Sequence, residues 1–248
     1  MITFSNLGRM GRLGNQLFQI ASTLGIAKNN SLSVGFTNWA YSNYLKKELP
    51  NFYGNIKSIF NVNEFCFSNI VVNDNTDIIG YLQSYKFFSN INIQDIFELK
   101  DDLKKLYSHF EFKNSVSIHV RRGDYLNNTH VYPILDLYYY ESSLKILNEI
   151  GINNPKIYIF SDDIMWCKSN FNFENQFFIE NNDDIIDLFI MSECENNIIS
   201  NSTFSWWGAF LNKNPYKKVI CPSIWFNNTN EIVNFKYDDL IPENWIKN

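Results

Sequence analysis

The segment Ser115–Tyr125, which reads SVSIHVRRGDY, contains the residues of this chain that are most able to do chemistry. An alternating run of apolar, β-branched residues ends abruptly in His119, Arg121, Arg122 and Asp124. A short apolar run bounded by turn residues is typical of a buried strand of an α/β sheet, and ligands bind at the carboxyl ends of such strands. Guanidinium groups match the oxygens of a phosphate. The pattern therefore predicts an anion site, with a phosphate as its natural ligand.

Each of these residues also has a purely structural interpretation. On a continuing strand, neighbouring arginines point to opposite faces, so one can reach a ligand while the other pairs with a carboxylate such as Asp124. Arg121 and Arg122 can instead both form structural ion pairs. His119 can contact a base or a sugar, or it can be an ordinary buried histidine. The tripeptide RGD at 122–124 directly follows a buried strand, a position that displays an adhesion motif poorly.

Two further predicted strands end in polar residues, Ser161–Asp163 and Asn201–Ser205. Carboxyl ends of parallel strands meet at one edge of a sheet, so we expect these residues to gather with the arginines. Asp162 and Asp163 can accept hydrogen bonds from a guanine edge or from ribose hydroxyls, or can cap the next helix. Paired aspartates can hold Mg²⁺, but a D-x-D arrangement is absent here. A helix start offers hydroxyls and free N–H groups to a phosphate, and plain N-capping is compatible with that role; these residues are Asn201, Ser202, Thr203 and Ser205.

A glycine-rich loop follows the first predicted strand, Ile2–Ser5, and precedes a helix with apolar residues at helical spacing. Strand, loop and helix in this order bring backbone N–H groups close to a ligand. The loop matches neither G-x-G-x-x-G nor G-x-x-x-x-G-K-[ST], so nucleotide binding by either device is unsupported, and a tight turn is an equal alternative. Its candidate residues are Gly11, Gly14, Asn15 and Gln16.

The elements that must position these groups alternate between strand and helix patterns. Strands are expected over 31–36, 77–82, 116–120, 156–160, 176–180, 196–200 and 217–222, with helices from about residue 136, over 183–194 and over Ile93–Phe110. Such alternation predicts a parallel, doubly wound α/β sheet. We place a domain boundary near residues 110–115, between two α/β halves.

Composition narrows the function classes. The chain has 248 residues, 45% of them hydrophobic, and a formal net charge of −5, which argues against disorder and against a general nucleic-acid binder. The four cysteines are far apart without a C-x-x-C pair, so we expect reduced thiols and no zinc site. The start MITFSNLGRM lacks the pattern of a signal peptide, and no apolar window of about 18 residues occurs. A cytoplasmic location without a transmembrane segment is expected, with peripheral membrane association left open.

Several segments, in order along the chain, resemble glycosyltransferase family 11, the α-1,2-fucosyltransferases, and more loosely the wider fucosyltransferase group with an H-x-R-R motif. The matching segments are GRLGNQLFQIAS (11–22), IIGYLQSYKFF (78–88), HVRRGDY (119–125), FSDD (160–163) and NSTFSWWGAFL (201–211). The resemblance implies a GT-B-type α/β architecture of two Rossmann-like domains facing a cleft. Residues 1–112 would form the acceptor-side domain and residues 113–248 the domain that binds the GDP-sugar. Section 37–70 has little that matches, and we expect acceptor choice to depend on it.

The resemblance also implies roles for individual residues. Arg121, with Arg122 beside it, would clamp the β-phosphate, and Asn15 from the glycine loop would approach the donor from the other half. His119 with Asp162 or Asp163 would read guanine or ribose. The pyrophosphate would meet the start of the last helix, at Asn201, Ser202, Thr203, Phe204 and Ser205. Arg121, Asn15 and Asp124 are the candidate catalytic residues.

The implied reaction is an inverting transfer of L-fucose from GDP-β-L-fucose that needs no metal or other cofactor. Inverting transfer is a single displacement through an oxocarbenium-like state, and negative charge develops on the departing diphosphate. A cation and oriented N–H groups at that place lower the barrier, so Arg121 and a helix start can do the work usually given to Mg²⁺. The general base is unassigned: Asp124 is available, but an arginine partner would depress its pKa and weaken it.

The resemblance thus implies a hexosyltransferase that forms an α-1,2 linkage to a galactose-containing glycan in glycan biosynthesis. Its partners would be a GDP-sugar and a glycan acceptor, with no nucleic acid. Two alternatives stay open: a related transferase with another GDP-sugar or linkage, and a non-catalytic protein of the same fold that binds a glycan or nucleotide.

Overall fold

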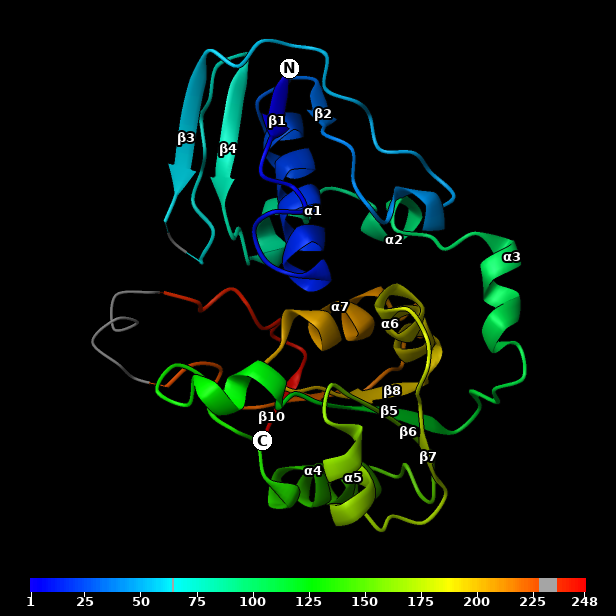
Figure 1. Ribbon diagram of the computed structural model, residues 1–248. Coiled ribbons are helices and arrows are strands. Elements are labelled where there is room, and N and C mark those ends of the chain that lie inside the picture. The colour runs from blue at the N-terminus through cyan, green and yellow to red at the C-terminus, as the bar shows by residue number, and fades with distance from the viewer. Residues whose placement is uncertain (64, 228–235) are drawn as a thin grey trace. The chain divides into compact units, whose positions relative to one another are not determined.

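The computed structural model describes residues 1–63, 65–227 and 236–248 (Figure 1). The described chain divides into two compact units. Unit 1 contains residues 1–104 and 236–243, and unit 2 contains residues 105–227 and 244–248. The late segment 236–243 belongs to unit 1 through Asp239, which accepts a hydrogen bond from the Phe67 backbone N–H at 2.9 Å and pairs with Lys86 at 2.5 Å. The sequence did not predict this return of the chain.

Unit 1 is built on a four-stranded parallel sheet in the order β2-β1-β4-β3. The strands are β1 (Ile2–Phe4), β2 (Val34–Phe36), β3 (Ser58–Val62) and β4 (Thr76–Gly80). Helix α1 (Leu13–Asn29) follows the glycine loop and packs beside the sheet (Figure 1). Two 3₁₀ turns, η1 (Ser42–Tyr44) and η2 (Tyr85–Phe88), complete the loops. The first strand, the glycine turn and the helix after it were predicted; β3 was not, because residues 39–70 show no clear periodicity.

The long amphipathic helix predicted over Ile93–Phe110 is wrong. The structure has three short pieces instead: α2 (Ile93–Ile96), α3 (Asp101–Lys104) and the 3₁₀ turn η3 (Lys105–Tyr107). Between the first two, Leu99 forms an antiparallel bridge with Leu45. Backbone hydrogen bonds from Lys46 to Glu98 and from Lys100 to Tyr44 flank that bridge. These long-range bonds, with Leu99 fully buried, outweigh local helix propensity.

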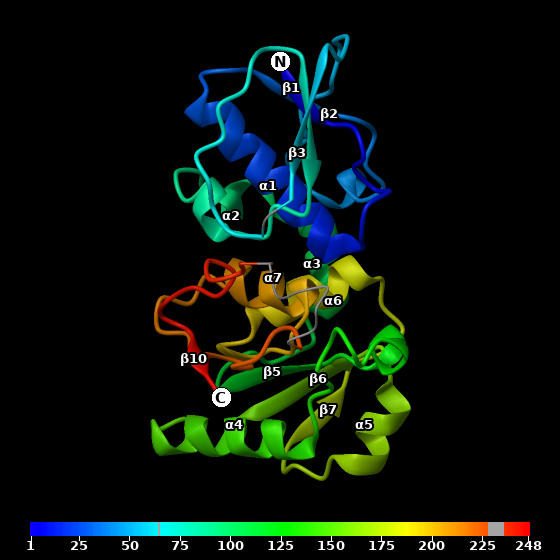
Figure 2. The ribbon, with the colours of Figure 1, turned by 90° about the vertical axis from the view of Figure 1, so that its left-hand side faces the viewer.

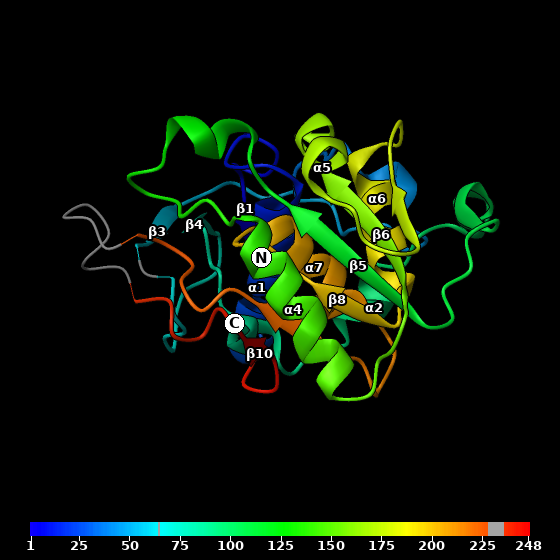
Figure 3. The same cartoon turned by 90° about the horizontal axis from the view of Figure 1, so that it is seen from below.

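Unit 2 contains a six-stranded, all-parallel sheet in the order β10-β9-β8-β5-β6-β7. The strands are β5 (Ser115–Val120), β6 (Lys156–Ser161), β7 (Gln176–Phe178), β8 (Asn196–Ile198), β9 (Val219–Cys221) and β10 (Ile246–Lys247). Helices α6 (Asp184–Glu193) and α7 (Thr203–Leu211) cover one face of this sheet (Figure 2). Helices α4 (Leu137–Glu149) and α5 (Ile164–Asn170) cover the other, the face seen in Figure 3. The predicted doubly wound arrangement is confirmed.

The core of unit 2 explains why its central strand, β5, forms where the sequence predicts it. Val116, Ile118 and Val120 are fully buried, and so are Trp206 and Trp207 of α7. Three of the four cysteines are buried and all four are free thiols. Burial from both sides fixes β5, and so fixes where its carboxyl end delivers the residues that follow. Within the described residues, no helix is long and apolar enough to cross a membrane.

Candidate functional site

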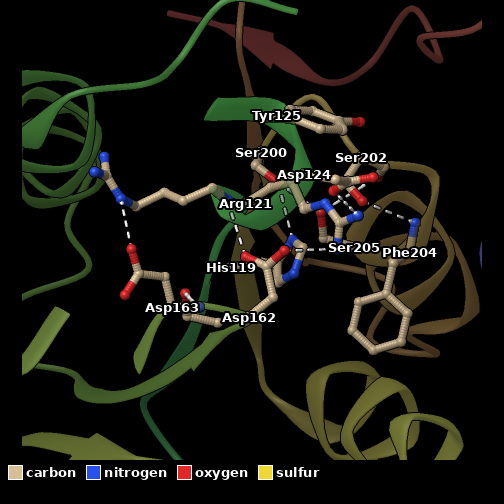
Figure 4. A network of polar contacts seen from close by, with 12 residues as sticks. His119, Arg121, Asp124, Tyr125, Asp162, Asp163, Ser200, Ser202, Phe204 and Ser205 are labelled. Carbon is tan, nitrogen blue, oxygen red and sulfur yellow. Dashed lines mark hydrogen bonds and ion pairs between the residues drawn. The ribbon is translucent and has the colours of Figure 1, made fainter. Parts of the chain in front are cut away.

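The three predicted strand ends of unit 2 do come together. Strand β5 lies between β8 and β6, and Val120 is in register with Ser161, while Ile118 is in register with Ile198. All three strands run parallel, so the residues after them emerge at one edge of the sheet. Figure 4 shows His119, Arg121, Asp162 and Ser200 within one network of polar contacts.

Arg121 lies at the centre of that network. Its Nη2 is 2.5 Å from Oδ1 of Asp124 and its Nη1 is 2.8 Å from Oδ2 of Asp162 (Figure 4). The guanidinium carbon also lies 5.1 Å from the ring centre of Tyr125, a cation–π distance. Nε is buried and has no hydrogen-bond partner among the described residues. The guanidinium group is thus held from three directions, and its side chain is 13% exposed.

Arg122 pairs with a different carboxylate. Its Nε donates to Oδ2 of Asp163 at 3.1 Å, and its guanidinium carbon lies 4.1 Å from the ring centre of Trp166. The guanidinium groups of the two neighbouring arginines therefore pair with different carboxylates. Both arginines pair with carboxylates in this structure, as the structural interpretation of the motif allowed.

The two aspartates after β6 differ in what they hold. Asp162 accepts a hydrogen bond from the Arg122 backbone N–H at 2.9 Å, in addition to its ion pair with Arg121. A Cβ atom at position 123 would meet the carboxylate of Asp162, so a larger residue in place of Gly123 would push that side chain aside. Asp163 caps α5 by accepting from the Trp166 backbone N–H at 3.2 Å. The helix-capping alternative is present for Asp163, and contact of either aspartate with guanine or ribose stays a prediction.

His119 is a buried, neutral group. It is 4% exposed, and its Nδ1 lies 2.9 Å from Oγ of Ser200, which lies 3.5 Å from Oγ of Ser205. Burial, with the positive charge of Arg121 as a smaller cause, lowers the pKa of His119 to about 3. The ring of Phe204 lies 5.3 Å from the imidazole, centre to centre. An uncharged imidazole can donate one hydrogen bond and accept one, and does not add to the positive charge of the site.

The start of α7 is anchored through Asn201 and Ser202. Ser202 is the N-cap, and its Oγ accepts from the Phe204 backbone N–H at 3.4 Å. The Asn201 amide nitrogen donates to the carbonyl oxygens of Pro133 and Trp225. Tyr125, in the 3₁₀ turn η4 (Gly123–Asn127) after β5, donates from its hydroxyl to the Asn201 carbonyl at 3.0 Å, which ties that turn to the start of α7. Ser202 is therefore a plain N-cap of α7, a helix of nine residues. The first backbone N–H groups of α7 point toward the edge of the sheet at which the carboxyl ends of β5, β6 and β8 lie.

Tyr125 and Ser200 are residues that sequence reasoning missed. Tyr125 closes the HVRRGDY segment and Ser200 precedes the NSTF segment, so each was next to a candidate. Their roles depend on contacts across the sheet, to Asn201 and His119, which adjacency in the sequence does not show.

In unit 1, side-chain amides order the glycine loop. Gln16 donates to the Gly11 carbonyl at 3.0 Å and accepts from the Trp39 indole N–H at 2.8 Å. Gln83 donates to Oδ1 of Asn15 at 2.8 Å. Gly11 has a φ of 81°, which glycine adopts without strain, while Gly14 lies inside α1. Asn15 and Gln16 were expected in the glycine loop, but they lie in the first turn of α1, because the helix already begins at Leu13. Trp39 and Gln83 are partners that the sequence did not reveal.

Binding of a metal ion would need a cluster of histidine, cysteine or carboxylate side chains. Among residues 1–63, 65–227 and 236–248, no group of three or more His, Cys, Asp or Glu could hold a metal ion. The carboxylates nearest the site already contact Arg121 and Arg122.

The sequence of this chain is similar to that of a known protein family and of several characterised proteins. The sequence model of "Glycosyl transferase family 11" matches residues 9–247. An α-1,2-colitosyltransferase of Escherichia coli is 31% identical, over 96% of this chain and 96% of that protein. The O-antigen biosynthesis glycosyltransferase WbnK of Escherichia coli is 36% identical over 56% of this chain, a match that spans 51% of WbnK.

Solved structures of fucosyltransferases share the fold. POFUT1 in complex with GDP-fucose superposes with a TM-score of 0.58 at 14% identity, over 89% of this chain and 97% of that one. The fucosyltransferase NodZ from Bradyrhizobium gives a TM-score of 0.53 at 14% identity, over 85% and 92%. The expected GT-B-type α/β fold with two parallel sheets is confirmed.

Proposed function

Because the chain belongs to glycosyltransferase family 11, we propose that it transfers L-fucose from GDP-β-L-fucose to a galactose-containing glycan, with inversion and an α-1,2 linkage. The relative of nearly full-length coverage is named for α-1,2 transfer of a sugar, which supports the linkage. The cytoplasmic location and any peripheral membrane association stay predictions.

The observation that carries the proposal is the meeting of Arg121 with the start of α7 at one edge of the sheet in unit 2. Tyr125 contacts both, through its ring to Arg121 and through its hydroxyl to Asn201. A departing nucleoside diphosphate gathers negative charge on its β-phosphate, and a fixed cation with oriented N–H groups stabilises that charge. In this proposal Arg121 clamps the β-phosphate, and residues 201–205 contact the pyrophosphate.

The remaining donor contacts follow from the same edge. His119, neutral through burial, would present a hydrogen-bonding nitrogen to the base or the ribose. Arg122 is proposed to keep Asp163 and the start of α5 in place, since it pairs with that N-cap. The site needs no divalent ion in this proposal, because the cation that meets the diphosphate is a side chain of the chain itself.

We assign donor binding to the C-terminal domain, 113–248, and acceptor binding to the N-terminal domain, 1–112. A hollow of about 260 Å³ in unit 1 supports the second assignment. Amide, hydroxyl and lysine side chains line it, including Asn38, Ser42, Asn43 and Lys46. Such groups can donate and accept hydrogen bonds to sugar hydroxyls. Trp39, next to Asn38, bonds to Gln16 in the first turn of α1, beside Asn15.

One relative is named as a colitosyltransferase, and this observation favours GDP-colitose as a second candidate donor. Colitose is L-fucose without its 3-hydroxyl group, so the same phosphate contacts would serve both donors. A site that bonds the 3-hydroxyl rejects the sugar that lacks it, whereas an apolar site discriminates weakly.

The test is a donor panel with purified protein. We expect GDP-fucose or GDP-colitose to release GDP in the presence of galactose-containing acceptors, with UDP-sugars inactive. The variant Arg121→Ala should lose transfer while its thermal midpoint stays near that of the wild type. Near-normal turnover by this variant would show that the phosphate clamp is elsewhere, and a preference for UDP-sugars would overturn the donor assignment.

A further inference from the structure

The carboxyl edge of the sheet in unit 1 carries two amide side chains, those of Asn15 and Gln83. Strands β1 and β4 are parallel neighbours, so the chain leaves both strands at the same edge. The glycine loop and the first turn of α1, with Asn15, follow β1, and Gln83 follows β4. Ligands of open α/β sheets bind at this edge. The two amides therefore lie where a ligand of unit 1 is expected.

Among the described residues, the one hydrogen bond of the Gln83 side chain goes to Asn15. Its Nε2 donates to Oδ1 of Asn15 at 2.8 Å. Its Oε1 is buried without a donor from the residues that the structure describes, and the side chain is 5% exposed. A buried acceptor without a donor destabilises a fold. An apolar side chain would avoid that cost, so stability does not explain the amide at this position.

The backbone before Gln83 is strained as well. Leu82 is fully buried and has a φ of 54°, a left-handed conformation that leucine rarely adopts. Oγ of Ser22, in α1, donates to the Leu82 carbonyl at 3.0 Å. A Cβ atom at position 25 would overlap the Phe87 carbonyl group, so Gly25 lets η2 lie directly against α1. These contacts maintain the strained turn at Leu82, which brings Gln83 to the first turn of α1.

Two local costs, a strained leucine and an unpaired amide oxygen, thus meet at the residue that holds Asn15. Such costs persist at functional sites. We propose that Gln83 is a positioning residue for the transfer reaction: it fixes the side-chain amide of Asn15, and Asn15 contacts the transferred sugar. This inference rests on the proposed function. Gln83 is buried, so it acts through Asn15 and does not itself touch the substrate.

The direction of the hydrogen bond sets the orientation of the Asn15 amide. Because Gln83 donates to Oδ1, the oxygen of Asn15 faces Gln83, while its Nδ2 lies against Gly11. The nitrogen of an amide donates hydrogen bonds and its oxygen accepts them. A reversed Asn15 amide would therefore offer the sugar an acceptor in place of a donor.

The first test is a double-mutant cycle on kcat, measured with the GDP-sugar that the donor panel selects. Gln83→Met keeps the length of the side chain and removes the donor, so kcat should fall about tenfold. KM for the GDP-sugar should stay within about twofold, because the proposed diphosphate contacts are in unit 2. In an Asn15→Ala background the same substitution should change kcat less than about twofold. Equal losses in both backgrounds would overturn the proposal.

Two further variants separate positioning from stability. Gln83→Glu can accept a hydrogen bond from Asn15 but cannot donate one, and it should lose kcat as Gln83→Met does. Thr23→Val is the control, since it removes a buried hydrogen bond of α1, from Oγ1 of Thr23 to the Gln19 carbonyl at 2.7 Å. It should keep kcat within about twofold even where its thermal midpoint falls. A matching loss of kcat in Thr23→Val would show that the Gln83 variants act through stability alone.

The second test needs no activity. In ¹⁵N-labelled protein, the side-chain amide signals of Asn15, identified by their loss in Asn15→Ala, should shift in Gln83→Met and stay in place in Thr23→Val. Unshifted signals in Gln83→Met would overturn the hold of Gln83 on Asn15. If Gln83→Met fails to fold, as judged by its thermal midpoint, Gln83→Glu replaces it in both tests. If the wild type transfers no GDP-sugar, the proposed function fails, and the amide signals still decide whether Gln83 orders Asn15.

Discussion

The Nδ1 atom of His119 lies 2.9 Å from Oγ of Ser200, on the neighbouring strand end, and neither side chain is exposed. The contact joins β5 to the segment that leads into α7. It fixes the orientation of an imidazole that burial keeps neutral.

The first prediction concerns the pH dependence of stability. In the folded chain the pKa of His119 is about 3, below the ordinary value of 6.5. Between these values the unfolded chain binds a proton that the folded chain does not, so the free energy of unfolding falls as the pH drops below 6.5. The slope contributed is about 1.4 kcal/mol per pH unit. Denaturant titrations from pH 4 to 7 should show a shallower decline for His119→Gln than for the wild type; parallel curves would contradict it.

The second prediction concerns Tyr125. Replacement by Phe removes the hydroxyl that bonds the Asn201 carbonyl but keeps the ring over Arg121, and GDP affinity should fall about threefold. Replacement by Leu also removes the ring, and affinity should fall by about tenfold or more. Burial raises the pKa of Tyr125, so the hydroxyl is a donor throughout the measurable range. Tyr138→Phe, at a 74% exposed position, is the control and should change nothing.

A third prediction concerns the glycine loop of unit 1. Gln16→Leu would remove bonds to both the Gly11 carbonyl and the Trp39 indole, and should lower the free energy of unfolding by about 1–3 kcal/mol. Trp39→Phe removes one of the two bonds without touching Gly11. In chemical denaturation we expect both variants to be less stable than the wild type; a fully stable Gln16→Leu would show that the loop is ordered by other contacts.

The fourth prediction concerns Lys217, which lies in the loop after α7 and donates hydrogen bonds to carbonyls at the C-terminal end of that helix. Its Nζ donates to the carbonyls of Ala209, Phe210 and Asn212, at 2.7, 3.3 and 2.7 Å, and burial lowers its pKa to about 8. Lys217→Met leaves these helix-end carbonyls without their donor. A loss of about 1–3 kcal/mol in the free energy of unfolding is expected. Lys213→Met, at an exposed position of the same loop, should be nearly neutral by the same denaturation assay.

Much of unit 2 could be predicted from residue patterns alone. The alternating run before His119 made β5 recognisable, and the polar residues after Phe160 and Ser200 marked two more strand ends. Parallel strands deliver their carboxyl ends to one edge, so the convergence of the candidate residues followed without coordinates. The N-cap positions of Asp163 and Ser202 were also accessible, because capping depends on a few neighbouring residues.

Contacts between residues far apart in the sequence determine the features of the fold and of the site that residue patterns did not predict. The segment after Ile93 has helical periodicity, yet a bridge between Leu45 and Leu99 interrupts the helix, and nothing near Leu99 in sequence announces that partner. In the same way, the charges of Arg121 and Asp124 were evident from the sequence, but the hold of Asp162 on Arg121 across 41 positions was not. Local patterns report propensity and burial, which are properties of a short stretch. Which carboxylate pairs with which arginine depends on packing between strands, and only the tertiary structure determines that.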